Sequence, residues 1–365
     1  MLWHLFNSRN RTEFVEATEY KSFSILLPAY NEEACINRSI LEWLKLEYAG
    51  DFELIIINNN SSDLTLDIAE KYHAGHIKVI TCLEQGKANA LNMGLDIAKY
   101  DYMVSVDLDS IPDKNLLYEL NNVYNTDSNI IACGGRVGTY YVNDESPNYL
   151  MKMQEVELDQ GFLVLKNSHN YLNNSLTILS GCLTSCSIAF MNENNIRYDE
   201  GIWEDLKLTL DIQKVCKDTD YYIEYNCKAL VRTQVLRSYR AFYKQRKRWA
   251  RSYLCGVRCF KLRDFNRTVS FLLFIEGGLF SYFTNILSLI WIIVAIVYGG
   301  SVQFWMLFLL GFIVYVLYNF AVGYYNLFGM LYGFFIYRYL SLLINLVVLY
   351  RPMKYLYTWD KPPRV

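Results

Sequence analysis

The sequence predicts an α/β fold with a largely parallel, Rossmann-like sheet, followed by interfacial and transmembrane helices. Two observations predict it. Residues 23 to about 130 alternate short apolar runs with stretches of helical periodicity, and strands that alternate with helices form parallel sheets with right-handed crossovers. After Arg267 the composition changes abruptly, and residues 269–350 carry almost no charge apart from Glu276 and Arg338. A buried helical core explains this tail poorly, because its apolar runs have no amphipathic stripe.

Apolar periodicity divides the first part of the chain into elements. The predicted strands are Phe23–Leu27, Phe52–Ile57, Ile77–Thr81 and Tyr102–Val106. The predicted helices between them are Glu32–Leu46, Leu64–Tyr72 and Lys87–Lys99. Such sheets bind ligands beyond the carboxyl ends of their strands, so the residues that follow these strands are the first candidates for a binding site.

The middle of the chain is less regular. We expect strands at Ile130–Val137 and Ile188–Met191 and a helix at Glu204–Cys216. The stretch from Arg237 to Phe265 then interleaves arginine and lysine with aromatic residues. It is suited to binding phosphate, to lying on an anionic membrane surface, or to doing both along different faces.

These changes of composition divide the chain into five parts. They are an N-terminal extension (1–22), a cytosolic domain (23–236), a basic interfacial segment (237–267), a transmembrane region (268–350) and a C-terminal tail (351–365). The runs Phe280–Val297, Val302–Ala321 and Leu331–Tyr350 approach the length that crosses a bilayer, which predicts about three spans. Basic residues after the last run favour a cytosolic C-terminus and an even number of spans, so the count stays open.

Composition excludes some classes of function. The net charge of −2 over 365 residues provides no global basic field for nucleic acid. The nine cysteines lack a C-x-x-C pair or a histidine cluster, which favours reduced thiols in a cytosolic domain over a zinc site. Residues 1–21 lack the pattern of a secretory signal, and a short interfacial helix and a frayed terminus are both compatible with them.

Chemically distinctive motifs follow the predicted strands, open the predicted helices or lie in the basic stretch. In chain order they are Ala29-Tyr30-Asn31-Glu32, Gly86-Lys87-Ala88-Asn89, Asp107-Leu108-Asp109, Glu204-Asp205 and Gln245-Arg246-Lys247-Arg248-Trp249. Two carboxylates at a strand end can hold a hard divalent cation that also takes phosphate oxygens. Arginine offers a fork for phosphate, and tryptophan offers a flat apolar face for a sugar ring. Each motif alone also has an ordinary reading as a turn, a helix terminus or a solvated helix face.

Taken together and in this order, from about Phe23 to Trp249, these motifs resemble the processive branch of the family-two glycosyltransferases. That branch includes cellulose, chitin and hyaluronan synthases. The resemblance implies a GT-A nucleotide-sugar-binding domain with its catalytic part in the cytosol, and an integral protein of the cell membrane. It also implies a UDP-sugar donor, a polysaccharide or lipid-linked acceptor, and Mg²⁺ or Mn²⁺ as cofactor.

The resemblance also assigns roles to individual residues. Asp205 is the expected general base, which takes the proton of the acceptor hydroxyl. Asp109 is the expected metal ligand. The expected nucleotide-binding residues are Ala29, Asn31, Glu32, Asn59, Lys87, Asp107, Gln245 and Arg248. Trp249 is the expected platform for the acceptor sugar, with Trp203 and Glu204 beside it.

Two positions depart from the family pattern. Asn59 stands where the family usually has an aspartate that contacts uracil, and an amide can still pair with that base. Trp203 replaces a threonine beside the catalytic acidic pair, so acceptor identity transfers less directly. Arg248-Trp249-Ala250-Arg251-Ser252 resembles the Arg-Trp-x-x-Ser run of chitin-oligomer and hyaluronan synthases, and this resemblance implies an N-acetylhexosamine donor.

The leading hypothesis is an inverting, metal-dependent enzyme that extends a β-linked polysaccharide at the membrane from a UDP-sugar of the UDP-GlcNAc type. A second is a single-transfer enzyme that acts on a lipid or cell-surface acceptor, and Trp249 favours the first. A third is a catalytically silent membrane scaffold. The intact set of acidic, basic and aromatic motif residues argues against it.

Overall fold

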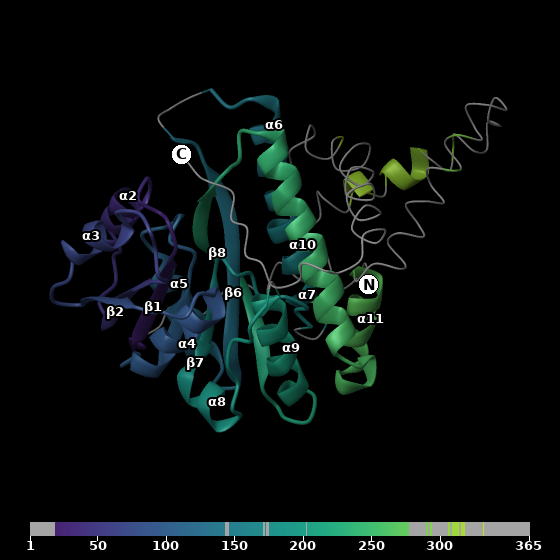
Figure 1. Ribbon diagram of the computed structural model, residues 1–365. Helices are drawn as coiled ribbons and strands as arrows, with labels where there is room; N and C mark the ends of the chain where they lie inside the picture. The colour runs from purple at the N-terminus through teal and green to yellow at the C-terminus, as the bar shows by residue number, and fades with distance from the viewer. Residues whose placement is uncertain are drawn as a thin grey trace.

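The computed structural model describes residues 19–142, 146–170, 172, 175–201 and 203–276, with a few single residues and short runs between 290 and 331. Its centre is an eight-stranded mixed sheet in the order β3-β2-β1-β4-β7-β6-β8-β5 (Figure 1). The strands are β1 (Phe23–Ala29), β2 (Phe52–Asn58), β3 (Ile77–Thr81), β4 (Tyr102–Ser105), β5 (Ser110–Pro112), β6 (Ile130–Tyr140), β7 (Thr184–Ser187) and β8 (Tyr222–Gln234). The helices of the first part are α2 (Ile36–Trp43), α3 (Thr65–Glu70), α4 (Lys87–Ile97) and α5 (Leu116–Thr126).

The first half of the sheet is parallel, as the alternation of elements predicts. β1 pairs in parallel with β2 on one side and with β4 on the other, and β2 pairs in parallel with β3. All seven residues of β1 are buried, which explains its continuous apolar sequence, because helices cover both faces of a parallel sheet. The chain leaves β1 toward β2 and later returns to its other side as β4. The carboxyl ends of β1 and β4 therefore flank a topological switch point, where open α/β sheets bind ligands.

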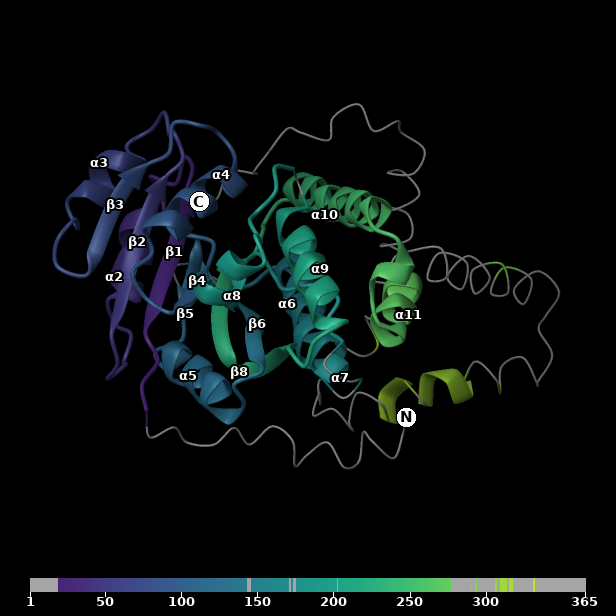
Figure 2. The same ribbon diagram turned by 90° about the horizontal axis from the view of Figure 1, so that it is seen from below.

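The second half of the sheet is mixed. β7 pairs antiparallel with β4 and with β6, β6 pairs in parallel with β8, and the short β5 closes the edge against β8. The elements packed around this half are α6 (Tyr149–Asp159), the π-helix η3 (Gln160–Lys166), α7 (Asn167–Asn170), α8 (Ile188–Glu193), α9 (Glu204–Cys216) and α10 (Tyr239–Cys259). In both views α6, α9 and α10 lie on the same side of β6 and β8 (Figures 1 and 2).

One predicted element is wrong. Ile188–Met191 was expected as a strand, whereas these residues form the first turns of α8. The strand of this region is β7, which ends at Ser187, and the Ser187 hydroxyl accepts from the Phe190 N–H at 3.3 Å and caps the helix. A four-residue apolar run has no periodicity that separates strand from helix, so the cap decides it.

The basic segment folds mainly as α10, which packs against α9 and, through Phe242, against Leu150 of α6 and Leu236. After the short turn η4 (Leu262–Asp264), α11 (Arg267–Glu276) packs Val269 and Leu273 against α9. Within the part of the chain that the structure describes, no helix is both long and apolar enough to span a bilayer. The predicted spans lie almost wholly outside the described residues, as do residues 1–18 and the tail 351–365.

Candidate active site

The loops that follow β1 and β2 are tied to each other by side-chain hydrogen bonds. Asn31 has a left-handed backbone (φ 52°), and its side-chain oxygen accepts from the Ser62 N–H at 2.9 Å. The Glu32 N–H donates to the Thr65 hydroxyl at 2.7 Å. These contacts hold the carboxyl ends of two neighbouring parallel strands in one rigid edge, where Ala29, Asn31 and Glu32 were expected to bind a nucleotide.

Both polar atoms of the Asn59 side-chain amide form hydrogen bonds with the backbone. Its Nδ2 donates to the Glu84 carbonyl at 2.8 Å, and its Oδ1 accepts from the Gly86 N–H at 2.8 Å. The residue is 2% exposed. In this conformation Asn59 fastens the loop before Lys87 to β2, and the two amide contacts expected for uracil are made to the backbone.

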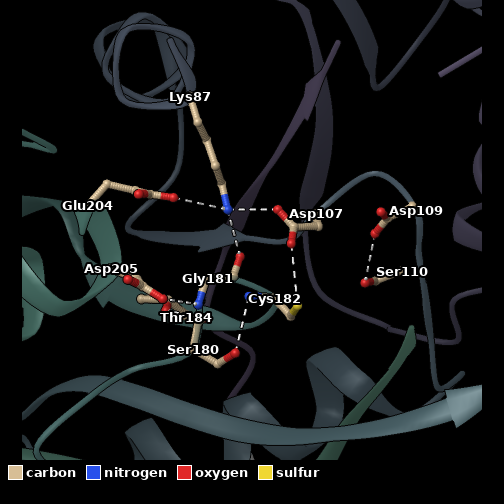
Figure 3. Close-up of polar contacts among 10 residues, drawn as sticks. All are labelled: Lys87, Asp107, Asp109, Ser110, Ser180, Gly181, Cys182, Thr184, Glu204 and Asp205. Carbon is tan, nitrogen blue, oxygen red and sulfur yellow. Dashed lines mark hydrogen bonds and ion pairs between the residues drawn. The ribbon is translucent and has the colours of Figure 1, made fainter. Parts of the chain in front are cut away.

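Lys87, the first residue of α4, lies among carboxylates. Its Nζ is 2.7 Å from Asp107 Oδ1 and 3.7 Å from Glu204 Oε1, and it also donates to the Gly181 carbonyl at 3.2 Å (Figure 3). Burial alone would lower the pKa of Lys87, but the charges of Asp107 and Glu204 raise it above its ordinary value. Lys87 is therefore a fixed positive charge that joins α4, the end of β4 and the start of α9.

Glu204 and Asp205 open α9 and point into the same cluster (Figure 3). Burial raises the pKa of Glu204 to about 7, the charge of Lys87 opposes this rise, and the charge of Asp205 adds to it. Asp205 Oδ2 accepts from the Gly181 N–H at 3.2 Å, and its Oδ1 accepts from the Leu206 N–H at 2.8 Å. These two backbone donors hold the Asp205 carboxylate in one orientation.

Gly181 is needed for this arrangement. A Cβ there would lie 3.1 Å from Lys87 Nζ and 3.3 Å from Asp205 Oδ2, closer than side chains ordinarily approach. The peptide of Gly181 thus links the two residues, its carbonyl accepting from Lys87 and its N–H donating to Asp205.

The two aspartates after β4 lie in different environments. Asp107 Oδ2 accepts from the Cys182 thiol at 3.3 Å, and its side chain is 24% exposed. The chain then turns, with the Ser110 N–H donating to the Asp107 carbonyl at 2.9 Å, and Asp109 is 1% exposed. Its Oδ1 accepts from the Ser110 hydroxyl at 3.4 Å. Asp109, the expected metal ligand, is thus buried, because the turn folds its carboxylate inward.

α10 brings Arg248 and Trp249 to the site and buries their neighbour Arg246. The Arg246 guanidinium pairs with Glu157 of α6 through two contacts, Nε to Oε1 at 2.7 Å and Nη2 to Oε2 at 2.6 Å. It also lies 4.1 Å from the centre of the Trp249 ring and donates to Gln245. Gln245 is 7% exposed and serves this internal contact, whereas Trp249 is 41% exposed.

A cavity of about 350 Å³ gathers much of the expected site. Its lining includes six of the residues that the sequence singled out: Lys87, Asp107, Glu204, Asp205, Arg248 and Trp249. Other expected residues are placed elsewhere: Ala29, Asn31, Glu32 and Asn59 at the ends of β1 and β2, Asp109 beneath the turn, Trp203 packed on Gly201, and Gln245 beside Arg246.

Residues 24–195 match the family model described as glycosyl transferase family 2. The chain carries a family 2 glycosyltransferase domain. The predicted recognition, and with it the prediction of a glycosyltransferase, is confirmed. The poly-β-1,6-N-acetyl-D-glucosamine synthase of Staphylococcus aureus strain COL is 29% identical over 300 residues, covering 80% of this chain and 68% of the relative. The synthase of the same name from Staphylococcus epidermidis is 29% identical over 290 residues, covering 78% of this chain and 65% of the relative.

The fold comparison agrees with the predicted GT-A architecture. A mannosyltransferase from Pyrobaculum calidifontis, solved in complex with GDP-Man and Mn²⁺, superposes with a TM-score of 0.60 at 16% identity. The match covers 96% of this chain and 94% of that one. The Rossmann-like α/β fold of the glycosyltransferase is therefore confirmed.

The cavity also involves residues whose part in it the motifs did not identify. Gly181, Cys182 and Glu157 line the cavity, and Arg246 braces it from α10. Gly181 and Cys182 belong to no motif of recognisable spacing, so the sequence alone could not identify them as cavity residues. Glu157 meets Arg246 only through the packing of α6 on α10, over 89 residues of sequence separation. Arg246 lay inside the recognised basic motif, but charge alone could not show which arginine turns inward.

We expect the replacement Glu157→Ala to lower the free energy of unfolding by about 3–5 kcal/mol, because it leaves the buried Arg246 guanidinium without a counter-charge. Urea unfolding of the purified chain, followed by tryptophan fluorescence, measures this. The double variant Glu157→Leu/Arg246→Met should lose less stability than the single one, since no buried charge remains. Unfolding of Glu157→Ala at the wild-type urea concentration would contradict the expectation.

Proposed function

We propose that this glycosyltransferase transfers a sugar from a UDP-sugar of the UDP-GlcNAc type to the end of a growing β-linked polysaccharide, with inversion at the anomeric carbon. One observation carries the proposal: a single cavity is lined by a cationic pair, a fixed carboxylate and an exposed aromatic ring. The similarity to synthases of a β-linked N-acetylglucosamine polymer supports the donor class.

The donor diphosphate is assigned to the cationic side of the cavity. Lys87 and Arg248 both line it, and Lys87 is held by Asp107 at the end of β4. Ammonium and guanidinium groups in a partly closed site stabilise the charge that develops on a departing diphosphate. The nucleoside is assigned to the neighbouring edge at the ends of β1 and β2. There Asn59 acts through the loop that it anchors, and Asn31 and Glu32 belong to the loop that follows β1.

Asp205 is assigned the role of general base. Inversion by a single displacement requires a base on the acceptor side, within hydrogen-bond reach of the attacking hydroxyl. The two backbone N–H groups that bond to Asp205 fix the direction of its carboxylate. Glu204, whose pKa is raised to about 7, supports this site by taking part in the charge balance around Lys87.

The carboxylates that follow β4 are ligands suited to a divalent cation. Mg²⁺ and Mn²⁺ take hard oxygen ligands, and in nucleotide sites Mg²⁺ is commonly bound by one or two carboxylates together with substrate phosphates. Asp107 and Asp109 supply two such carboxylates within three residues, although the described residues hold no cluster of three or more candidate ligands. We assign the cation to these aspartates, where it would neutralise diphosphate charge. The buried Asp109 must turn toward the cavity to reach it.

Membrane attachment belongs to the same proposal. α10 presents exposed Tyr239, Arg240 and Lys244, a combination suited to a headgroup layer, and the nearly uncharged residues 269–350 follow it. We propose that the polymer is made at the cytosolic face of a cell membrane, with the domain boundaries at residues 23, 237 and 268.

The direct test is incubation of the full chain, in membranes and in purified form, with labelled UDP-GlcNAc, UDP-glucose and GDP-mannose. The expected result is label from UDP-GlcNAc in long products on a gel, with UDP released. A single sugar added to lipid would favour the single-transfer alternative. No transfer and no donor hydrolysis with any sugar would contradict the proposal.

We expect Trp249→Ala to bind UDP nearly as the wild type does but to make little long polymer. The change removes the exposed ring while Lys87 and Arg248 remain. Ring contacts of this kind contribute about 1 kcal/mol or more, enough to weaken acceptor retention several-fold. Product length is measured against UDP released.

The matched control is Tyr243→Ala, because Tyr243 lies on the same helix with a similar exposure of 39% and is not a cavity residue. It should elongate normally. Full-length polymer from Trp249→Ala at the wild-type rate would remove the main reason to prefer a processive synthase.

A further inference from the structure

One wall of the cavity is built by a π-helix. α6 runs without interruption into η3, and this continuous segment contributes Leu158, Gly161, Phe162 and Lys166 to the lining. π-Helical turns are rare and occur frequently at functional sites, because the wider turn displaces residues from their helical positions. The Lys166 ammonium of this wall already has a hydrogen-bond acceptor within the protein, because its Nζ donates to the Ile178 carbonyl at 2.9 Å.

This wall lies against the part of the sheet formed by β6 and β8. η3 packs on β6 and β8, and the Phe162 carbonyl accepts from the Tyr225 hydroxyl of β8 at 2.8 Å. The nucleotide edge is at β1 and β4, on the far side of β7 in the strand order. Under the proposed function, the acceptor sugar would reach Asp205 in the space between η3 and α10, since Phe162 and Trp249 line the same cavity as Asp205.

Gly161 leaves open space in this wall. A Cβ at this position would meet no atom within 4 Å, and the backbone is not in the left-handed region that favours glycine. Neither packing nor conformation therefore requires glycine here. A helical glycine is less stable than an alanine because it has more backbone freedom to lose on folding. The absence of a side chain thus leaves room in the cavity at the expense of helix stability.

We propose that Gly161 determines the size of the acceptor subsite, leaving room for a pyranose ring with a bulky equatorial substituent such as an acetamido group. The inference rests on the proposed function, because it takes the cavity as the site of transfer. It predicts that a side chain at position 161 excludes acceptor sugar while the donor side is unchanged, since Lys87, Asp107 and Arg248 belong to other elements.

The test compares Gly161→Ala and Gly161→Leu with the wild type, using the full chain. Three quantities are measured: the affinity for UDP, the rate of UDP-GlcNAc hydrolysis to free sugar, and the KM for a short β-linked N-acetylglucosamine oligosaccharide. Gly161→Ala should unfold at a higher temperature than the wild type and raise the acceptor KM. Gly161→Leu should lower transfer by about tenfold or more and keep UDP affinity and donor hydrolysis.

The control is Leu165→Phe, which enlarges a side chain on the same π-helix that is 46% exposed and is not a cavity residue. It should leave acceptor KM unchanged. Wild-type acceptor KM and polymer length in Gly161→Leu overturn the size role while the proposed function stands. Joint loss of UDP affinity and thermal stability also overturns it, because glycine would then be structural. A wild-type chain that neither transfers nor hydrolyses any UDP-sugar overturns the proposed function itself.

Discussion

Replacing Asp205 by asparagine is expected to lower the rate of sugar transfer by about a hundred- to ten-thousand-fold, the usual contribution of a general base. The amide has nearly the same shape, but the Gly181 and Leu206 N–H groups donate to separate carboxylate oxygens, Oδ2 at 3.2 Å and Oδ1 at 2.8 Å, so the single amide oxygen keeps one of these two contacts. It cannot take a proton from the acceptor hydroxyl. UDP affinity should therefore stay near the wild-type value while turnover is lost.

Calorimetry with UDP and the rate of UDP release separate these two effects. Asp211→Asn is the matched control, since Asp211 lies on the same helix, pairs with Lys207 and is not a cavity residue. It should transfer at the wild-type rate. If UDP affinity and turnover of Asp205→Asn fall together, Asp205 binds the donor and the base is another residue.

The second large effect is expected at Asp109. Asp109→Asn should abolish the metal-dependent part of UDP binding and, with it, transfer, because a neutral amide is a much weaker ligand for a hard dication than a carboxylate. Asparagine is preferred to alanine because Asp109 is 1% exposed, and a smaller side chain would also leave a cavity. EDTA should impose the same loss on the wild type.

UDP binding with and without Mn²⁺ measures this prediction. Asp113→Asn serves as the control, since Asp113 follows the same turn. Its carboxylate pairs with Arg232 at 3.3 Å, and neither residue lines the cavity. Unchanged metal-dependent binding by Asp109→Asn, or wild-type turnover in EDTA, would contradict a metal role for Asp109. The cation would then be assigned to Asp107 alone or to no residue of this site.

The elements that carry their own periodicity could be predicted from the sequence. β1 to β4 and α4 agree closely with expectation because parallel strands are buried on both faces and the intervening helices are amphipathic. α9 has the predicted bounds, Glu204–Cys216. The order of the second half of the sheet could not be predicted. β5 has three residues and pairs with β8 more than a hundred residues later, so no local pattern specifies it.

The motifs from which the function was predicted can be read directly in the sequence. They are carboxylates at the end of a strand, an acidic pair at the start of a helix, and a basic-aromatic motif on another helix. Spacing and residue chemistry predicted the family, the parallel half of the sheet and six of the residues that line the cavity, because each motif is short and locally encoded.

Only the tertiary structure decided which of these side chains meet. Packing of α6 on α10 turned Arg246 inward onto Glu157 and left Arg248 and Trp249 at the cavity. The turn after β4 left Asp107 partly exposed and buried Asp109. The backbone of the loop before α4 formed hydrogen bonds with both polar atoms of the Asn59 amide. Burial and hydrogen-bond partners depend on elements far apart in the chain, and residue spacing carries no information about which of them come into contact.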